Sequence, residues 1–61
     1  MKYCYSIHYS SIRGELYHQT TLDHEITDND IPDIEYEIEL SIGCDNVTVL
    51  SYDLVEVKGD K

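Results

Sequence analysis

The sequence predicts an α+β domain in which one helix packs on a three-stranded sheet, in the chain order strand, strand, helix, strand. Three features of the 61 residues favour this fold: a strand-like alternation followed by a glycine turn, helix-boundary residues around positions 31–42, and a β-branched run at positions 47–57. Residues 1–57 are expected to form a single small domain, and residues 58–61 a frayed tail.

The first two strands are expected to form a hairpin. Large and small residues alternate over positions 3–10, Arg13 and Gly14 supply a turn, and residues 15–26 return as a second strand. With Arg13 and Gly14 as the central turn residues, the residue numbers of two cross-strand partners add up to 27. A four-residue loop would place the same side chains on each face, so the type of turn stays open. One face then gathers the apolar set Tyr3, Tyr5, Ile7, Tyr9, Leu16, Leu22 and Ile26, and the other gathers the polar set Cys4, Ser6, His8, Ser10, Gln19, Thr21 and Asp23.

The middle of the chain fits two structures. Strict alternation over residues 34–42 is typical of a strand, but one helical stripe also forms from Ile31, Ile34, Ile38 and Ile42. Pro32, with acidic and amide residues before it, suits a first helical turn, and Gly43 stands where a glycine ends a helix. A helix is therefore predicted over residues 31–42. The alternative is an all-β four-stranded meander, in which this segment and residues 47–57 form a second hairpin.

Negative charge is concentrated between positions 14 and 57. That stretch holds twelve carboxylates and no Lys or Arg, and the formal net charge of the chain is −9. Direct binding to nucleic acid or to an anionic membrane is not expected, because both require cations on the protein. The expected partner is a protein with a basic surface. Alternatively, the charge only keeps a small protein soluble and monomeric.

The sequence also favours a cytoplasmic location. It lacks a run of about 18 apolar residues that would predict a membrane span. Its first residues lack the long apolar stretch of a secretory signal. The two cysteines, Cys4 and Cys44, are too few for a disulfide scaffold and are expected to pack as free thiols.

No pattern in the chain indicates catalysis or metal binding. The three histidines and two cysteines lack the close, recurring spacing of zinc ligands. Neither a nucleophile elbow nor a glycine-rich phosphate loop is present, and a thin core gives little desolvation to shift a pKa. The sequence therefore predicts a protein that is not an enzyme and that needs no metal or cofactor.

The order of the segments resembles that of a group of short phage- and prophage-encoded proteins. The likeness consists of a Tyr-rich opening strand, a glycine turn, a Thr-rich strand, an Asp-Ile helix start and the segment at positions 45–52. It spans nearly the whole chain, but its motifs are structural and mark no chemistry. It departs from the group on the helix, where members often carry Lys or Arg and this chain carries none. The resemblance implies a viral or prophage origin and a role in host takeover or counter-defence.

The outer face of the predicted helix is the candidate binding surface. With the isoleucine stripe inward, Tyr36 and Leu40 form an i,i+4 pair that points away from the sheet. Carboxylates flank this pair on both sides, so the candidate partner-binding residues are Asp33, Glu35, Tyr36, Glu37, Glu39 and Leu40. An apolar pair with a charged rim is typical of an interface hot spot, although single exposed apolar residues are common without function. In the all-β alternative Tyr36 and Leu40 would join the core.

Together these features predict a non-enzymatic acidic protein that binds and inhibits a host protein, such as a defence or nucleic-acid-binding factor, by covering its basic surface. Two alternatives are a nucleic-acid mimic, which needs no apolar anchor, and an accessory structural protein without a host target. Open sheet edges and a thin core also favour a homodimer, in which the polar sheet face or an uncharged strand edge is buried.

Overall fold

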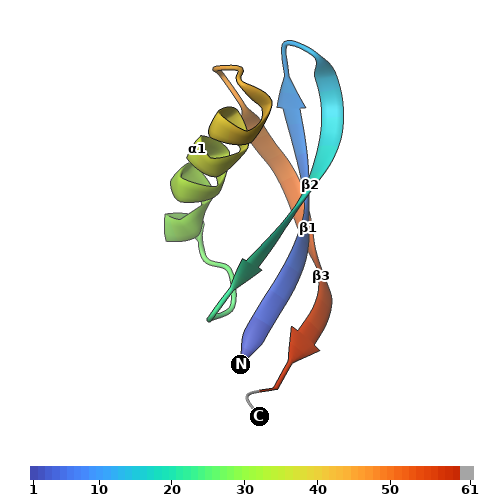
Figure 1. The fold of residues 1–61 in the computed structure, drawn as a ribbon, viewed down its shortest axis with the longest axis vertical. Helices are drawn as coiled ribbons and strands as arrows, with labels where there is room; N and C mark the ends of the chain where they lie inside the picture. Colours follow the sequence, from blue (N-terminus) through green and yellow to red (C-terminus); the bar gives the residue numbers. More distant parts are fainter. Residues whose placement is uncertain (60–61) are drawn as a thin grey trace.

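The computed structural model, which describes residues 1–59, contains one three-stranded antiparallel sheet and one α-helix on a face of that sheet (Figure 1). The spatial order of the strands is β2-β1-β3, so β1 is central. The strand-strand-helix-strand order is confirmed, and the all-β alternative is wrong because the middle of the chain is helical. In chain order the elements are β1 (Lys2–Ser11), β2 (Gly14–Leu22), a short 3-10 turn (Asp28–Asp30), α1 (Ile31–Ile42) and β3 (Thr48–Lys58).

The hairpin between β1 and β2 turns at Ile12 and Arg13, one residue earlier than the sequence predicts. Opposed positions therefore sum to 25 instead of 27, and Tyr5 faces Thr20 rather than Leu22. The predicted register is wrong by two residues. A shift of two preserves the side-chain alternation, so the predicted apolar and polar faces of the two strands are correct.

Hydrogen bonds of Ser11 explain the position of this turn. The Ser11 hydroxyl accepts a hydrogen bond from the Arg13 N–H at 3.1 Å and donates one to the Gly14 carbonyl at 3.3 Å. Gly14 has a φ of 102°, a left-handed conformation that favours glycine. The glycine therefore stands just after the two turn residues rather than within them.

Strand β2 ends at Leu22, four residues before the predicted strand end at position 26. Beyond that point the backbone hydrogen bonds to side chains instead of to a strand: the Ile26 N–H donates to the Tyr5 hydroxyl at 3.0 Å. Residues 23–27 therefore leave the sheet and connect β2 to the 3-10 turn before α1.

Helix α1 has the predicted bounds, and each end has a physical cause. Before the helix, the Asp30 carboxylate accepts hydrogen bonds from the Thr27 N–H at 2.8 Å and the Thr27 hydroxyl at 3.1 Å. Pro32 occupies the first turn, where the missing N–H costs nothing. At the other end Gly43 adopts a φ of 70° and donates its N–H to the Glu39 carbonyl at 2.9 Å.

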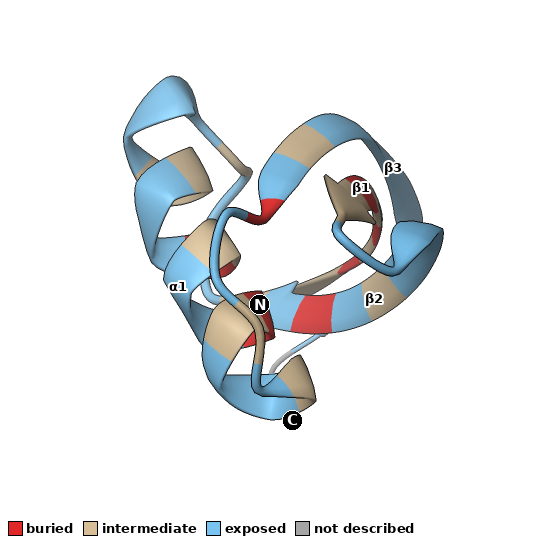
Figure 2. Ribbon diagram, turned by 90° about the horizontal axis from the view of Figure 1, so that it is seen from above, coloured by how far each residue is buried: buried red, intermediate tan, exposed pale blue. Residues whose placement is uncertain are grey.

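The core lies between α1 and the central strand. Its buried hydrophobic residues come mainly from the apolar face of β1 and the inward stripe of α1: Tyr5, Ile7, Tyr9, Ile34, Ile38 and Val47. Figure 2 shows these buried positions on the inner side of the helix and sheet, whereas β3 is almost wholly exposed. The isoleucine stripe predicted to face inward does so, with Ile34 and Ile38 buried and Ile31 and Ile42 half-buried.

Strand β3 starts and ends one residue later than predicted and carries two more residues than the β1 segment it pairs with. The two register shifts place the extra residues at Leu50 and Val55. The strand extends through Lys58, one residue into the expected tail, and positions 60–61 of that tail lie outside the described residues. No helix formed by residues 1–59 is long and apolar enough to cross a membrane.

Candidate functional site

The outer face of α1 carries two large apolar side chains in solvent. Tyr36 is 62% exposed and Leu40 is 67% exposed, one helical turn apart. The inward isoleucines fix this orientation, because residues 36 and 40 fall on the opposite side of the helix from Ile34 and Ile38. The outward placement expected from the sequence is confirmed, and the role of these residues in binding stays a prediction.

On one flank of this pair, two glutamates bind the backbone at the start of β3. The carboxylate of Glu35 accepts a hydrogen bond from the Val49 N–H at 2.9 Å. The carboxylate of Glu39 accepts one from the Val47 N–H at 3.3 Å. Both glutamates are half-buried, and these hydrogen bonds hold their side chains against the backbone.

Sequence reasoning missed these two contacts, although a spacing signal was present. One helical turn of four residues separates Glu35 from Glu39, about 6 Å along the axis. Two residues of extended chain separate Val47 from Val49, about 6.6 Å. The spacing of the two glutamates along the helix thus matches the spacing of the two valines along the strand. A helix that runs beside an edge strand can therefore bring each carboxylate to a backbone N–H, Glu35 to Val49 and Glu39 to Val47.

On the other flank, Glu37 contacts β2. Its carboxylate oxygen lies 2.8 Å from Nε2 of His18, which is on the helix-bearing face of the sheet. Asp33, on the same flank, is exposed and has no ion pair or side-chain hydrogen bond with residues 1–59. The six candidate residues thus form one continuous surface, but three of the four carboxylates also fasten the helix to the strands.

The surface remains strongly acidic despite these contacts. Residues 28–45 carry seven carboxylates and no Lys or Arg. Within residues 1–59, the side-chain partners of the helix carboxylates are backbone N–H groups and a histidine rather than Lys or Arg. Hydrogen bonds from neutral donors stabilise a carboxylate without cancelling its charge. The negative potential of this region is therefore available to a basic partner.

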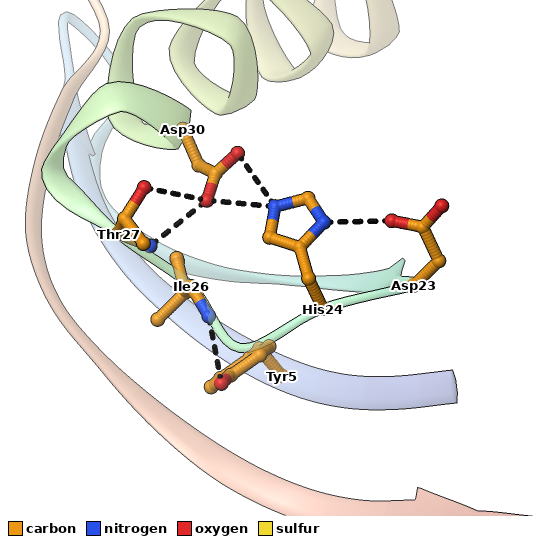
Figure 3. A network of polar contacts seen from close by, with 6 residues as sticks. All are labelled: Tyr5, Asp23, His24, Ile26, Thr27 and Asp30. Atoms are coloured by element: carbon orange, nitrogen blue, oxygen red, sulfur yellow. Dashed lines mark hydrogen bonds and ion pairs between the residues drawn. The ribbon is translucent and has the colours of Figure 1, made fainter. Parts of the chain in front are cut away.

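A second polar network joins the end of β2 to the start of α1 (Figure 3). Nδ1 of His24 lies 2.6 Å from an oxygen of Asp23, and Nε2 lies 3.0 Å from both oxygens of Asp30. The hydrogen bonds with Asp23 and then with Asp30 raise the pKa of His24 above its ordinary value of 6.5. The hydrogen bond with His24 is also the main cause that lowers the pKa of Asp23 and of Asp30 below 3.8. Only a protonated ring can donate from both nitrogens at once.

The cysteines and the remaining histidine form separate local contacts. The Thr21 hydroxyl donates to Sγ of Cys4 at 3.7 Å, and both Cys4 and Cys44 are half-buried free thiols. His8 stacks on Tyr17 and lies 3.0 Å from a Glu15 oxygen. In the part of the chain that the structure describes, no three His, Cys, Asp or Glu side chains are grouped in a way that could hold a metal ion. That the protein is not an enzyme stays a prediction.

Comparisons with protein-family models, with curated proteins and with solved structures find no match for this chain. The resemblance to short phage proteins therefore stays a prediction. What the protein does is inferred from its own residues, above all from the outer face of α1.

Proposed function

We propose that the protein is a non-enzymatic acidic binding protein that inhibits a host protein by covering its basic surface with the outer face of α1. Its place of action is the cytoplasm of the host cell, and its target belongs to the proteins that need a basic groove, such as nucleic-acid-binding or defence factors. The observation that carries this proposal is the exposed pair Tyr36 and Leu40 between two rows of carboxylates.

Tyr36 and Leu40 supply the apolar contact that a surface of charges alone lacks. A surface of carboxylates attracts cations and speeds association, but its net contribution to affinity is limited by desolvation. A tyrosine and a leucine that leave water on binding add apolar contact at the centre of the interface. The arrangement therefore favours an anchored binder over a nucleic-acid mimic, in which no apolar group is needed.

The internal contacts of the carboxylates support the same function. Glu35, Glu37 and Glu39 are held by β3 and β2 before any partner arrives. A side chain that is already fixed loses less conformational entropy on binding than a freely rotating one. The partner therefore meets a prearranged row of negative charge around Tyr36 and Leu40.

Capture of host proteins at two salt concentrations tests the proposal. The protein is immobilised and exposed to bacterial lysate at about 0.1 M and about 1 M salt, where charges are screened beyond about 10 Å and about 3 Å respectively. Wild type is compared with Tyr36→Ala and with Tyr17→Ala, a matched control because Tyr17 is also a largely exposed tyrosine but lies on β2. Captured proteins are quantified by mass spectrometry.

The anchored binder is expected to capture a basic protein at low salt and to keep part of it at high salt. Tyr36→Ala should lose most of the high-salt fraction, and Tyr17→Ala should keep it. Complete release by salt with no effect of Tyr36→Ala would contradict the anchor and favour the nucleic-acid mimic. Capture of no basic protein at either concentration would contradict the proposal and favour an accessory structural role.

A further inference from the structure

Half of the helix-bearing face of the sheet has no helix over it. A helix of 12 residues is about 18 Å long, whereas a strand of 11 residues spans about 36 Å. Figure 1 shows α1 beside one half of the sheet, while the end of the sheet near the N-terminus extends beyond the helix. Large apolar side chains of β3 on this face remain partly in solvent toward that end: Leu54 is 49% exposed and Val57 39%.

The open half lies at a free strand edge. In the order β2-β1-β3, strand β3 has a neighbour on one side only. The backbone N–H and C=O groups of its outer side are therefore available to another strand, an arrangement that invites pairing between chains. The available segment beyond the helix contact is residues 53–58, since at the other end Glu39 accepts a hydrogen bond from the Val47 N–H and Glu35 one from the Val49 N–H.

Residues 53–58 are complementary to a second copy of themselves. When two copies run antiparallel about a two-fold axis next to Val55, Asp53 of each faces Lys58 of the other. In the same register Leu54 of each faces Val57 of the other. Opposite charges and apolar side chains are the cross-strand pairs that stabilise an antiparallel sheet.

The faces of the strand agree with this register. Leu54 and Val57 are both opposed to tyrosines of the apolar face of β1, so they lie on the helix-bearing side. Asp53 and Lys58 are opposed to polar-face residues of β1, so they lie on the other side. In a regular strand, residues three apart point to opposite faces; the extra residue Val55 brings Leu54 and Val57 to the same face.

The charge distribution also permits this contact. The acidic residues 28–45 belong to α1 and its flanks, beside the other half of the sheet. Of the three Lys and Arg residues within residues 1–59, Lys2 and Lys58 lie at this open end, where they are paired across the two strands. Two copies joined at residues 53–58 therefore keep their acidic helices away from the shared edge, which limits like-charge repulsion.

We propose that residues 53–58 of β3 pair antiparallel with the same residues of a second copy, so that two three-stranded sheets join into one sheet of six strands. The pairing buries Leu54 and Val57 against each other and forms two symmetric contacts between Asp53 and Lys58. The partner on this surface is thus a second copy of the chain, and the interface leaves the outer face of α1 open.

A charge-swap series tests this pairing in the intact protein. The weight-average mass is measured by sedimentation velocity from about 1 to about 500 µM, a range suited to weak complexes. Wild type is compared with Asp53→Lys, Lys58→Asp and the double variant Asp53→Lys/Lys58→Asp, all at exposed positions. The matched control is Asp45→Lys, which is also exposed and, like Asp53→Lys, changes the net charge from −9 to −7 by replacing one carboxylate with one ammonium.

The mass of wild type is expected to rise toward that of a dimer with concentration. Each single swap should raise the dissociation constant at least about tenfold, because like charges then face each other across the interface. The double variant should return to within about threefold of wild type. Asp45→Lys should not weaken the dimer, since it only lowers the general repulsion between the acidic chains.

A mass that stays monomeric over the whole range would overturn the proposal. So would a dimer that Asp53→Lys and Lys58→Asp leave unchanged, or one that the double variant fails to restore. A mixed sample of isotope-labelled and unlabelled wild type gives an independent measurement. Intermolecular nuclear Overhauser contacts are expected between Leu54 of one copy and Val57 of the other, and contacts elsewhere would contradict this register.

Discussion

The central strand β1 and the edge strand β3 differ in burial although their apolar side chains share one face of the sheet. Tyr5 and Ile7 of β1 are 5% and 0% exposed, whereas their β3 partners Leu54 and Tyr52 are 49% and 40% exposed. Both strands show a face of large apolar residues in the sequence. Alternation therefore identifies the apolar face of a strand, but position in the sheet and helix length decide whether that face is covered.

Helix length explains why the open half exists. The 12 residues of α1 cover about half the length of the 11-residue strand β3. The central strand is sheltered by a neighbour on each side, and an edge strand by only one. For the same apolar composition, the covered half holds the fold together and the open half is available to a partner.

The largest expected effect comes from shortening one aliphatic side chain in the central strand and one in the edge strand. Ile7→Ala should lower the free energy of unfolding by about 3 kcal/mol, because it leaves a cavity in a fully buried position. Leu54→Ala removes the same number of carbons but should cost only about 1 kcal/mol, because the leucine is half in solvent. Urea denaturation followed by circular dichroism measures both.

Two further choices keep this comparison informative. Ile7→Val, expected to cost about 1 kcal/mol, replaces Ile7→Ala if that variant does not fold. Low protein concentration removes any contribution of self-association to the stability of wild type. Equal losses from Ile7→Ala and Leu54→Ala would contradict the distinction between a covered central strand and an open edge strand.

A smaller effect is expected where the helix is fastened to β3. Glu35→Ala leaves the part-buried Val49 N–H without its acceptor and should cost about 1 kcal/mol. Tyr36→Ala, at the next position, should change the free energy of unfolding by less than about 0.5 kcal/mol, because Tyr36 lies in solvent. Amide hydrogen exchange by NMR adds a local measurement: exchange at Val49 should accelerate in Glu35→Ala and stay unchanged in Tyr36→Ala. A stability loss in Tyr36→Ala as large as in Glu35→Ala would show that the outer face is structural.

Much of the fold could be predicted because its signals are local. The isoleucine stripe, Pro32 and Gly43 act within one or two helical turns, and they gave the correct bounds of α1. The alternation of β1 gave the correct faces. The predicted hairpin register was wrong because the turn residues are Ile12 and Arg13, with the Ser11 hydroxyl hydrogen-bonded to the Arg13 N–H and the Gly14 carbonyl and the glycine after the turn.

The candidate site was predicted less completely because its contacts are long-range. The outward position of Tyr36 and Leu40 follows from the helical period alone. Two contacts of the site depend on which strand lies on each side of α1: that of Glu35 with Val49 and that of Glu37 with His18. The strand order is set by long-range pairing, and no local sequence pattern predicts it. The sequence therefore indicated free rim charges where the structure has charges that also fasten the helix.

The smallest expected effect concerns the polar network in which His24 joins the end of β2 to the start of α1. Because its folded pKa is raised above 6.5, His24 stabilises the fold fully below that pH and loses this contribution as the pH rises through the raised value. The pKa values of Asp23 and Asp30 are lowered in the folded protein, so their ionised carboxylates stabilise the fold above pH 3.8. This stabilisation is lost as the pH falls through the lowered pKa values. The network should therefore stabilise most between these limits, at about pH 4 to 6.5.

Comparison of wild type with His24→Gln at pH 5.5 and pH 8.5 isolates this contribution, since the other histidines and carboxylates are common to both proteins. The difference in urea midpoint should be larger at pH 5.5, where the ring is protonated and can donate to both carboxylates. It should also shrink in high salt, because the side chains of His24 and Asp23 are largely exposed and that of Asp30 is partly exposed. A difference that stays constant between the two pH values would mean that His24 links β2 to α1 by packing alone and that its charge contributes nothing.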